Sequence, residues 1–120
     1  MGAVWAIAYT LDAADRAAYC AWFHGEHIPE KLARPGYDWA GHYEGEGRWL
    51  ALFGARDART FLDPTPGQLK TRQDARTKVM VACRRGVAAW VLAEVAHAGR
   101  ADTATAAVRL SVRAPDDADA

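Results

Sequence analysis

The residues best suited to chemistry lie in one short stretch, WFHGEHIPEKLARPG, at positions 22–36. It holds two histidines, His24 and His27, and two acids, Glu26 and Glu30. An imidazole titrates near neutral pH (roughly 6.5), so His27 could move protons in a cell. Glu26 is its neighbour in the sequence, and Glu30 follows it by three residues, within side-chain reach on a helix. A carboxylate that orients the imidazole would make His27 a better general base.

The same stretch allows two other roles for its histidines. Pro29 leaves a helix carbonyl without a donor, and His27 could cap that carbonyl at the helix end. His24 and His27 are also spaced as in some two-histidine metal sites. A metal would need a further ligand, which only His42, His97 or an acid could supply. We therefore predict neither a metal nor an organic cofactor.

Aromatic residues near this stretch favour the binding of a ring compound. The chain has five tryptophans in 120 residues. Aromatic side chains can form the walls of a ligand site, and a tyrosine hydroxyl can polarise a carbonyl, although both also serve core and dimer packing. The predicted catalytic residues are His27, Glu26 and Glu30. The predicted substrate contacts are Trp22, His24, Trp39, His42, Tyr43 and Tyr9.

Several reaction classes lack their motifs. The chain has no G-x-G-x-x-G and no G-x-x-x-x-G-K sequence, so dinucleotide and P-loop binding are unsupported. Its only serine is Ser111, and no serine or cysteine stands in a nucleophile elbow. Proton transfer on a bound organic molecule remains, as does binding without chemistry.

Composition excludes some partners. Fifteen basic and fifteen acidic residues cancel, whereas a nucleic-acid binder carries a basic surplus. No run approaches the ~20 apolar residues of a membrane span, and the N-terminus does not resemble a secretory signal. Cys20 and Cys83 are too few for a disulfide framework and lack zinc-like spacing. We expect a cytoplasmic protein that partners with neither nucleic acid nor membrane.

The hydrophobic pattern predicts strands and helices in the order β-α-β-β-α-β, the ferredoxin-like α+β arrangement with a four-stranded antiparallel sheet. The predicted strands are 3–11, 37–45, 48–54 and 86–97, and the predicted helices are 13–33 and 68–85, with a short helical turn at 57–63. Asp12 is the expected N-cap of the first helix, and Pro29 should kink it or start a second short helix. Its expected buried stripe is Ala14, Ala17, Ala18, Ala21, Gly25, Ile28 and Leu32.

The second strand leaves one question of register open. Alternation places Tyr37, Trp39, Gly41 and Tyr43 on one face, and Asp38, Ala40, His42 and Glu44 on the other. Only one of His42 and Tyr43 can therefore face the helices. The sequence does not decide which one.

Apolar residues on both faces of the sheet predict a homodimer. The first strand carries Trp5, Ile7 and Tyr9 on one face and Val4 and Ala8 on the other. Two helices cover one face, and the second would form a large exposed patch in a monomer. Face-to-face pairing of two sheets would cover it. We assign residues 1–99 to this domain, 100–114 to a C-terminal extension with a possible edge strand, and 115–120 to a disordered acidic tail.

Two segments resemble the EthD-like proteins of the dimeric α+β barrel superfamily. In WFHGEHIPEKLARPGYDWAGHY, at 22–43, a Trp precedes a sequence similar to EH-x-P-E-R, followed by a PG-aromatic turn and a strand ending in Tyr. DPTPGQLKTR, at 63–72, is similar to that group's NPTPWTRR. Lys31 replaces the Arg of that pattern, Tyr37 replaces a Phe, and Gly67 stands where a Trp is common.

The resemblance implies a homodimer whose sheets form a barrel, with a small-molecule cavity in each subunit. Relatives in the superfamily include lactone isomerases, polyketide cyclases and cofactor-free monooxygenases. Our leading interpretation is a cofactor-independent enzyme that transfers protons on a small ring-containing or lactone-like metabolite. The alternatives are a non-catalytic binding or accessory module and a haem-handling barrel.

Overall fold

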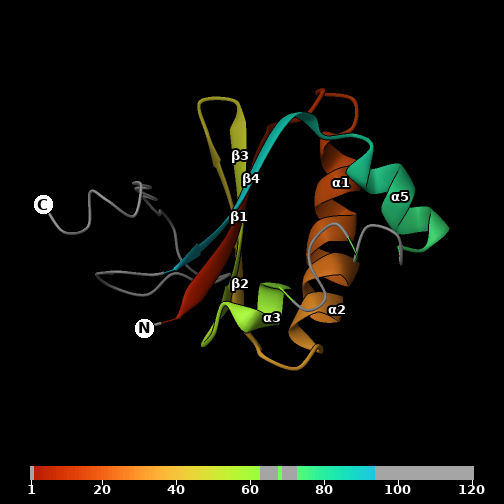
Figure 1. Ribbon diagram of the computed structural model, residues 1–120. Helices are drawn as coiled ribbons and strands as arrows, with labels where there is room; N and C mark the ends of the chain where they lie inside the picture. The colour runs from red at the N-terminus through yellow and green to blue at the C-terminus, as the bar shows by residue number, and fades with distance from the viewer. Residues whose placement is uncertain (1, 63–67, 69–72, 94–120) are drawn as a thin grey trace, which may run out of the picture.

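The strands form one antiparallel sheet in the order β2-β3-β1-β4. The computed structural model describes residues 2–62, 68 and 73–93. The strands are β1 (Ala3–Thr10), β2 (Tyr37–Gly45), β3 (Arg48–Ala55) and β4 (Arg85–Ala93). The helices, all on one side of the sheet in Figure 1, are α1 (Arg16–Trp22), the π-helix η1 (Phe23–His27), α2 (Ile28–Leu32), α3 (Arg59–Leu62) and α5 (Ala75–Val81). This is the predicted ferredoxin-like α+β fold.

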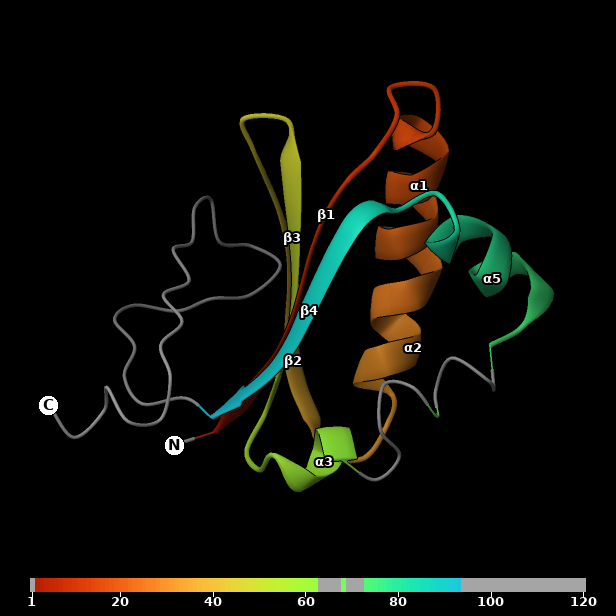
Figure 2. The ribbon, with the colours of Figure 1, turned by 45° about the horizontal axis from the view of Figure 1, so that its top comes forward.

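The first helical segment continues past Pro29 instead of breaking there. α1, η1 and α2 form one continuous rod in Figure 2, and the Ile28 N–H donates to the carbonyl of Phe23, five residues back. Pro29 crowds the carbonyl of Gly25 in an ordinary α-helix, and a wider turn gives that carbonyl more room. The predicted second short helix is present as α2. The predicted N-cap is wrong, because α1 begins at Arg16 after Asp15 and the Asp12 carboxylate pairs with Arg85.

The buried face of this rod differs from the predicted alanine stripe. Every alanine of that stripe is exposed, as are Gly25 and Leu32, and only Ile28 is buried. The sheet is covered instead by Tyr19, Trp22, Phe23, His27, Ile28 and Lys31. Aromatic rings remove far more apolar surface from water than alanine does, so they determine which face turns inward.

The register of β2 decides between His42 and Tyr43. His42 pairs with Ala51, which pairs with Ile7 on the helix-covered face. Tyr43 packs on the opposite face, against a cluster formed by Val4, Ala6 and Leu52. His42 therefore faces the helices.

A β-bulge changes which residues share a face of β2. The register shifts between Tyr37 and Trp39. Tyr37 belongs to the main core on the helix side, while Trp39 packs in the cluster on the opposite face. The prediction that both lie on one face was wrong, because an extra residue in a strand inverts the alternation.

The face of the sheet opposite the helices is also apolar. Its cluster contains Val4, Ala6 and Leu52, with Trp39, Tyr43, Leu50 and Leu92 packed against it. The Trp39 and Tyr43 rings lie where a Cβ of Gly54 or Gly41 would be, so only glycine fits under them. We call this surface the outer face.

The C-terminal half is described only in part. α3 matches the predicted helical turn. α5 covers Ala75–Val81 of the predicted helix 68–85, and the Asp74 carboxylate accepts a hydrogen bond from the Thr77 N–H at its start. β4 matches the fourth predicted strand up to Ala93. The rest of that strand, the extension 100–114, the tail 115–120 and nearly all of the segment 63–72 lie outside the described residues.

Candidate functional site

His27 lies inside the molecule, between the helical rod and the sheet. Its side chain is 4% exposed, and its ring stacks on Trp22 with 4.4 Å between centroids. Phe23 and Phe53 pack against it at 5.4 and 6.1 Å. The buried His27 is thus the last residue of the π-helix, and π-helical turns occur frequently at functional sites.

Burial keeps His27 neutral. Desolvation lowers its pKa to about 3, and the nearby cations Lys31, Arg84 and Arg34 act in the same direction. Its Nδ1 atom is buried and has no hydrogen-bond partner among the described residues. That nitrogen therefore caps no helix carbonyl.

Lys31 follows His27 by one helical turn and is also buried. It is 4% exposed, and its Nζ lies 5.1 Å from the centroid of the Trp5 ring. Burial lowers the pKa of Lys31 to about 8, with Arg34 as the next cause. A buried ammonium that titrates near cellular pH can stabilise an oxyanion or give up a proton.

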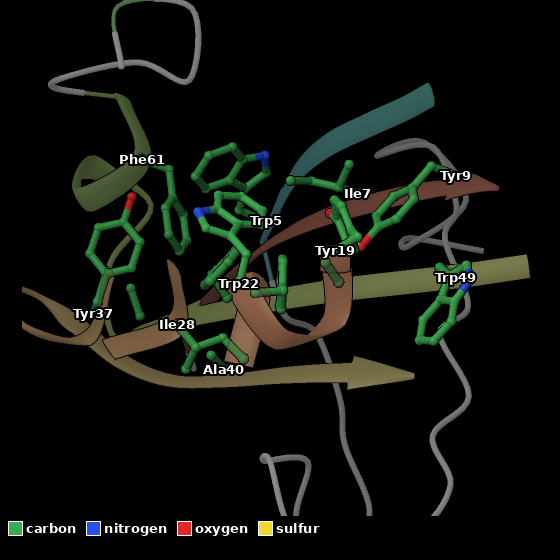
Figure 3. Packing of buried hydrophobic residues seen from close by; sticks show 14 of the residues in the cluster. Trp5, Ile7, Tyr9, Tyr19, Trp22, Ile28, Tyr37, Ala40, Trp49 and Phe61 are labelled. Atoms are coloured by element: carbon green, nitrogen blue, oxygen red, sulfur yellow. The ribbon is translucent and has the colours of Figure 1, made fainter. Parts of the chain in front are cut away.

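Two more polar atoms in this region lack partners. Among the described residues, the Trp5 Nε1 and Tyr37 hydroxyl atoms are buried without a hydrogen bond. The Trp5 and Tyr37 rings pack on Phe53 at 5.4 and 6.3 Å, as the His27 ring does. We call Trp5, Trp22, Phe23, His27, Lys31, Tyr37, Phe53 and Phe61 the inner cluster, much of which is visible in Figure 3.

The two predicted carboxylate partners of His27 face other residues. Glu26 pairs with Arg76 at 2.7 Å and Glu30 pairs with Arg34 at 3.1 Å. Both pairs are solvent-exposed. The structure therefore does not bring either carboxylate to the His27 imidazole.

The predicted substrate contacts divide between the two faces of the sheet. Trp22 borders His27 in the inner cluster. Trp39 and Tyr43 pack on the outer face, away from His27. The remaining three, His24, His42 and Tyr9, form a second constellation on the helix side.

This second constellation is a continuous chain of side-chain hydrogen bonds. Arg84 Nε donates to the Tyr19 hydroxyl at 2.8 Å, and Tyr19 donates to the Tyr9 hydroxyl at 2.8 Å. The Tyr9 hydroxyl lies 2.6 Å from His42 Nε2, and His42 Nδ1 lies 3.1 Å from His24 Nε2. We call these five residues the tyrosine–histidine chain.

The middle of this chain is shielded by aromatic rings. His42 stacks between Phe23 at 4.1 Å and Trp49 at 4.6 Å. Burial lowers the pKa of His42 to about 3, helped by His24 and Arg84. Burial also raises the pKa values of Tyr9 and Tyr19. His24 is exposed, so the chain runs from a half-buried arginine to solvent.

The two histidines of the helical rod do not converge on one ion. His27 is buried in the inner cluster, whereas His24 is exposed and contacts His42. Within residues 2–62, 68 and 73–93, no group of three or more His, Cys, Asp or Glu side chains could hold a metal. No helix in the same residues is long and apolar enough to cross a membrane.

Several residues of these sites were not among the predicted ones. Lys31 was noted only as a replacement for an arginine, and Trp5 and Tyr37 only as parts of a strand or motif. Tyr19 and Arg84 were not singled out. Tyr19, Phe23, His27 and Lys31 recur at four-residue steps, a spacing that places them on one helix face. That spacing could have identified Lys31 and Tyr19 as neighbours of His27. Arg84 has no comparable pattern around it.

The described elements and their order define a small ferredoxin-like α+β protein. Among solved structures, the chain is similar to Rv0793 from Mycobacterium tuberculosis, with a TM-score of 0.59 and 21% identity, covering 82% of this chain and 100% of that one. At this identity the likeness shows the fold alone. No known family matches the chain by sequence, and no curated protein is similar to it. The EthD-like resemblance therefore stays a prediction.

Proposed function

We propose that the inner cluster binds a small ring-containing or lactone-like metabolite and catalyses proton transfer on it without a cofactor. The observation that carries the proposal is that three of the four buried polar side-chain atoms with no partner among the described residues lie in the inner cluster: Trp5 Nε1, His27 Nδ1 and the Tyr37 hydroxyl. The fourth is Nη2 of Arg84. The three in the inner cluster belong to rings that pack on Phe53. Leaving such an atom unpaired costs about 1–3 kcal/mol, so native proteins keep few of them without a purpose.

The chemistry of these residues suits a carbonyl compound. Flat aromatic walls accommodate a ring, and the indole N–H, the phenol O–H and the Lys31 ammonium are all donors to a carbonyl oxygen. Neutral His27 is the acceptor of the set when its proton is on Nε2. One ligand oxygen could therefore accept hydrogen bonds from these donors, and one acidic C–H could face His27 Nδ1.

The proposed reaction is an isomerisation through an enolate. His27 Nδ1 removes a proton from the carbon beside the carbonyl, and the electron pair of that C–H bond forms the enolate. Lys31 stabilises the oxygen that becomes negative. That negative charge raises the pKa of the neighbouring His27, which makes it a stronger base as the reaction proceeds. The imidazolium then returns its proton to the γ-carbon, so no oxidant or metal takes part.

A β,γ-unsaturated five-membered lactone is a direct probe, because its conversion to the conjugated isomer is visible in the ultraviolet. We expect the wild-type protein to accelerate this conversion, and His27→Phe to lower the rate by roughly 100-fold or more. Lys31→Met should also lower it. Lys78→Met makes the same change at an exposed lysine of α5 and should leave the rate unchanged.

The other outcomes of this experiment point to the alternatives. If no form converts the lactone but the lactone raises the melting temperature of wild type and not of His27→Phe, the inner cluster is a binding module. A Soret band in the purified protein would favour a haem-handling barrel. Full conversion by a folded His27→Phe variant would contradict the proposed mechanism.

We also propose that two copies pair through the outer face. Trp90 pairs with Ala6 on this face and is 40% exposed, beside the apolar cluster of Val4, Ala6 and Leu52. Val4, Ala6 and Leu52 are already buried within one chain, so the exposed Trp90 ring is what pairing would cover. A second copy offers a surface of matching shape and polarity under two-fold symmetry.

Light scattering tests this pairing. The wild-type protein should elute at twice the chain mass, and Trp90→Glu should elute as a monomer, because it places a charge in the interface. Val79→Glu is the control, since Val79 is a 63% exposed residue of α5 and lies away from the outer face. A wild-type monomer, or a Trp90→Glu dimer, would count against pairing through this face.

A further inference from the structure

The tyrosine–histidine chain has a defined direction. Arg84 Nε can only donate, so the Tyr19 oxygen accepts from it and the Tyr19 proton passes toward Tyr9. The Tyr9 proton then points to His42 Nε2, which leaves the His42 proton on Nδ1, facing His24. Each hydroxyl between Arg84 and His24 accepts one hydrogen bond and donates one, and each His42 ring nitrogen takes part in one. Such an order is what concerted proton transfer along hydrogen bonds requires.

The chain is also insulated along its length. Arg84 lies over the rings of Tyr9 and Tyr19, 5.2 and 5.8 Å from their centroids. Phe23 and Trp49 cover the two faces of His42. His24 is the exposed member of the chain.

The middle of the chain holds no charge near neutral pH. The pKa of His42 is lowered and those of Tyr9 and Tyr19 are raised, so all three stay neutral near pH 7. Other titratable or charged groups around the chain are Cys20, which faces both tyrosines, and the exposed pair of Arg16 and Glu44, with Arg16 over Trp49. A middle section that holds no charge passes a proton on instead of storing it.

We propose that the tyrosine–histidine chain is a proton relay between the buried Tyr19 hydroxyl, beside the half-buried Arg84, and solvent at His24. When a bound molecule with an acidic proton gives it to the Tyr19 oxygen, the Tyr19 proton moves to Tyr9 and the Tyr9 proton moves to His42 Nε2. The His42 proton on Nδ1 moves to His24, which releases it to water. One proton enters and one leaves, and His42 changes from the Nδ1–H to the Nε2–H tautomer, which must revert before the next transfer. The relay does not depend on the proposed role of His27.

The exchange of tyrosine hydroxyl protons with water tests the relay without a substrate. In protein labelled with ¹³C at tyrosine Cζ and dissolved in equal parts of H₂O and D₂O, slow hydroxyl exchange splits the Cζ signal into two lines. Fast exchange merges them. We expect merged lines for Tyr9 and Tyr19 in the wild type, and split lines in His24→Gln and His24→Leu, because losing the base should slow exchange by roughly 100-fold.

The two variants separate relay from structure. Glutamine can keep a hydrogen bond to His42 but cannot carry a proton, so a merely structural His24 would be replaced by it without effect. Tyr37 is the internal control, since its hydroxyl is outside the chain and should behave alike in all forms. Free imidazole should restore fast exchange in His24→Ala. Split lines for Tyr9 in the wild type, or merged lines in a folded His24→Gln, would overturn the relay.

Discussion

Lowering the pH from 7.5 to 5 is expected to reduce the free energy of unfolding by about 4 kcal/mol through two histidines alone. His27 and His42 each have a pKa of about 3 in the folded chain, because both are buried, against roughly 6.5 when unfolded. The unfolded state therefore binds more protons between these values. The contribution of these two histidines to stability is fully present above about pH 6.5. It is lost as the pH falls toward 3, by about 1.4 kcal/mol per pH unit for each histidine.

Urea unfolding at several pH values between about 7.5 and 4.5 measures this loss, above the range where carboxylates titrate (roughly 4). His27→Phe should remove about half of the slope. It should not weaken the protein at neutral pH, since it removes an unpartnered nitrogen and keeps a ring against Trp22. His42→Gln should remove the other half. An unchanged slope in both variants would mean that neither imidazole resists protonation in the folded chain.

The fold could be predicted because its pattern is repeated in many residues. Alternating apolar residues in 37–45 and 48–54, with a glycine-rich turn between them, leave few other interpretations than a hairpin. The order of elements then restricts the topology. Features that depend on one or two residues were harder to predict. The bulge after Tyr37 depends on local backbone geometry, which alternation does not encode.

The site could be predicted only as far as residue type allows. His27 was identified because an imidazole near acids suggests catalysis, and the structure places it inside the core. Glu26 and Glu30 were chosen by spacing along the helix, but arginines on the surface pair with both. Nearness in sequence says little about such pairing, because a long charged side chain can gain a partner at small cost when it stays in water.

The tyrosine–histidine chain could not be derived from local sequence. Tyr9 and His42 are 33 positions apart, and Tyr19 and Arg84 are 65 apart. Their contact requires the register of β1, β3 and β2 together with the position where α5 ends. A register error of one residue would have turned His42 to the outer face and Tyr43 toward the helices. The sequence did not decide whether His42 or Tyr43 faces the helices, so it could not predict the tyrosine–histidine chain.

Phe23→Ala is the substitution from which we expect the largest loss of stability at neutral pH, about 3–5 kcal/mol. Phe23 is fully buried and separates the two sites, with His42 stacked on it at 4.1 Å and His27 at 5.4 Å. Removing the ring opens a cavity beside an unpartnered nitrogen, and a cavity with polar atoms in its wall admits water. The expected result is therefore a lower free energy of unfolding and higher pKa values for both histidines.

Combining urea unfolding with the pH series distinguishes these two effects. Phe23→Ala should lower stability at pH 7.5 and also flatten the loss of stability toward pH 5, because hydration raises the pKa of His27 and His42 toward roughly 6.5. Phe23→Leu is the matched control: it fills most of the volume, should cost less than about 1.5 kcal/mol, and should keep the full slope. If Phe23→Ala lost stability but kept the pH dependence of stability of the wild type, the exclusion of water from His27 and His42 would not depend on the Phe23 ring. Burial by the sheet and by Trp22 and Trp49 would then have to account for both lowered pKa values.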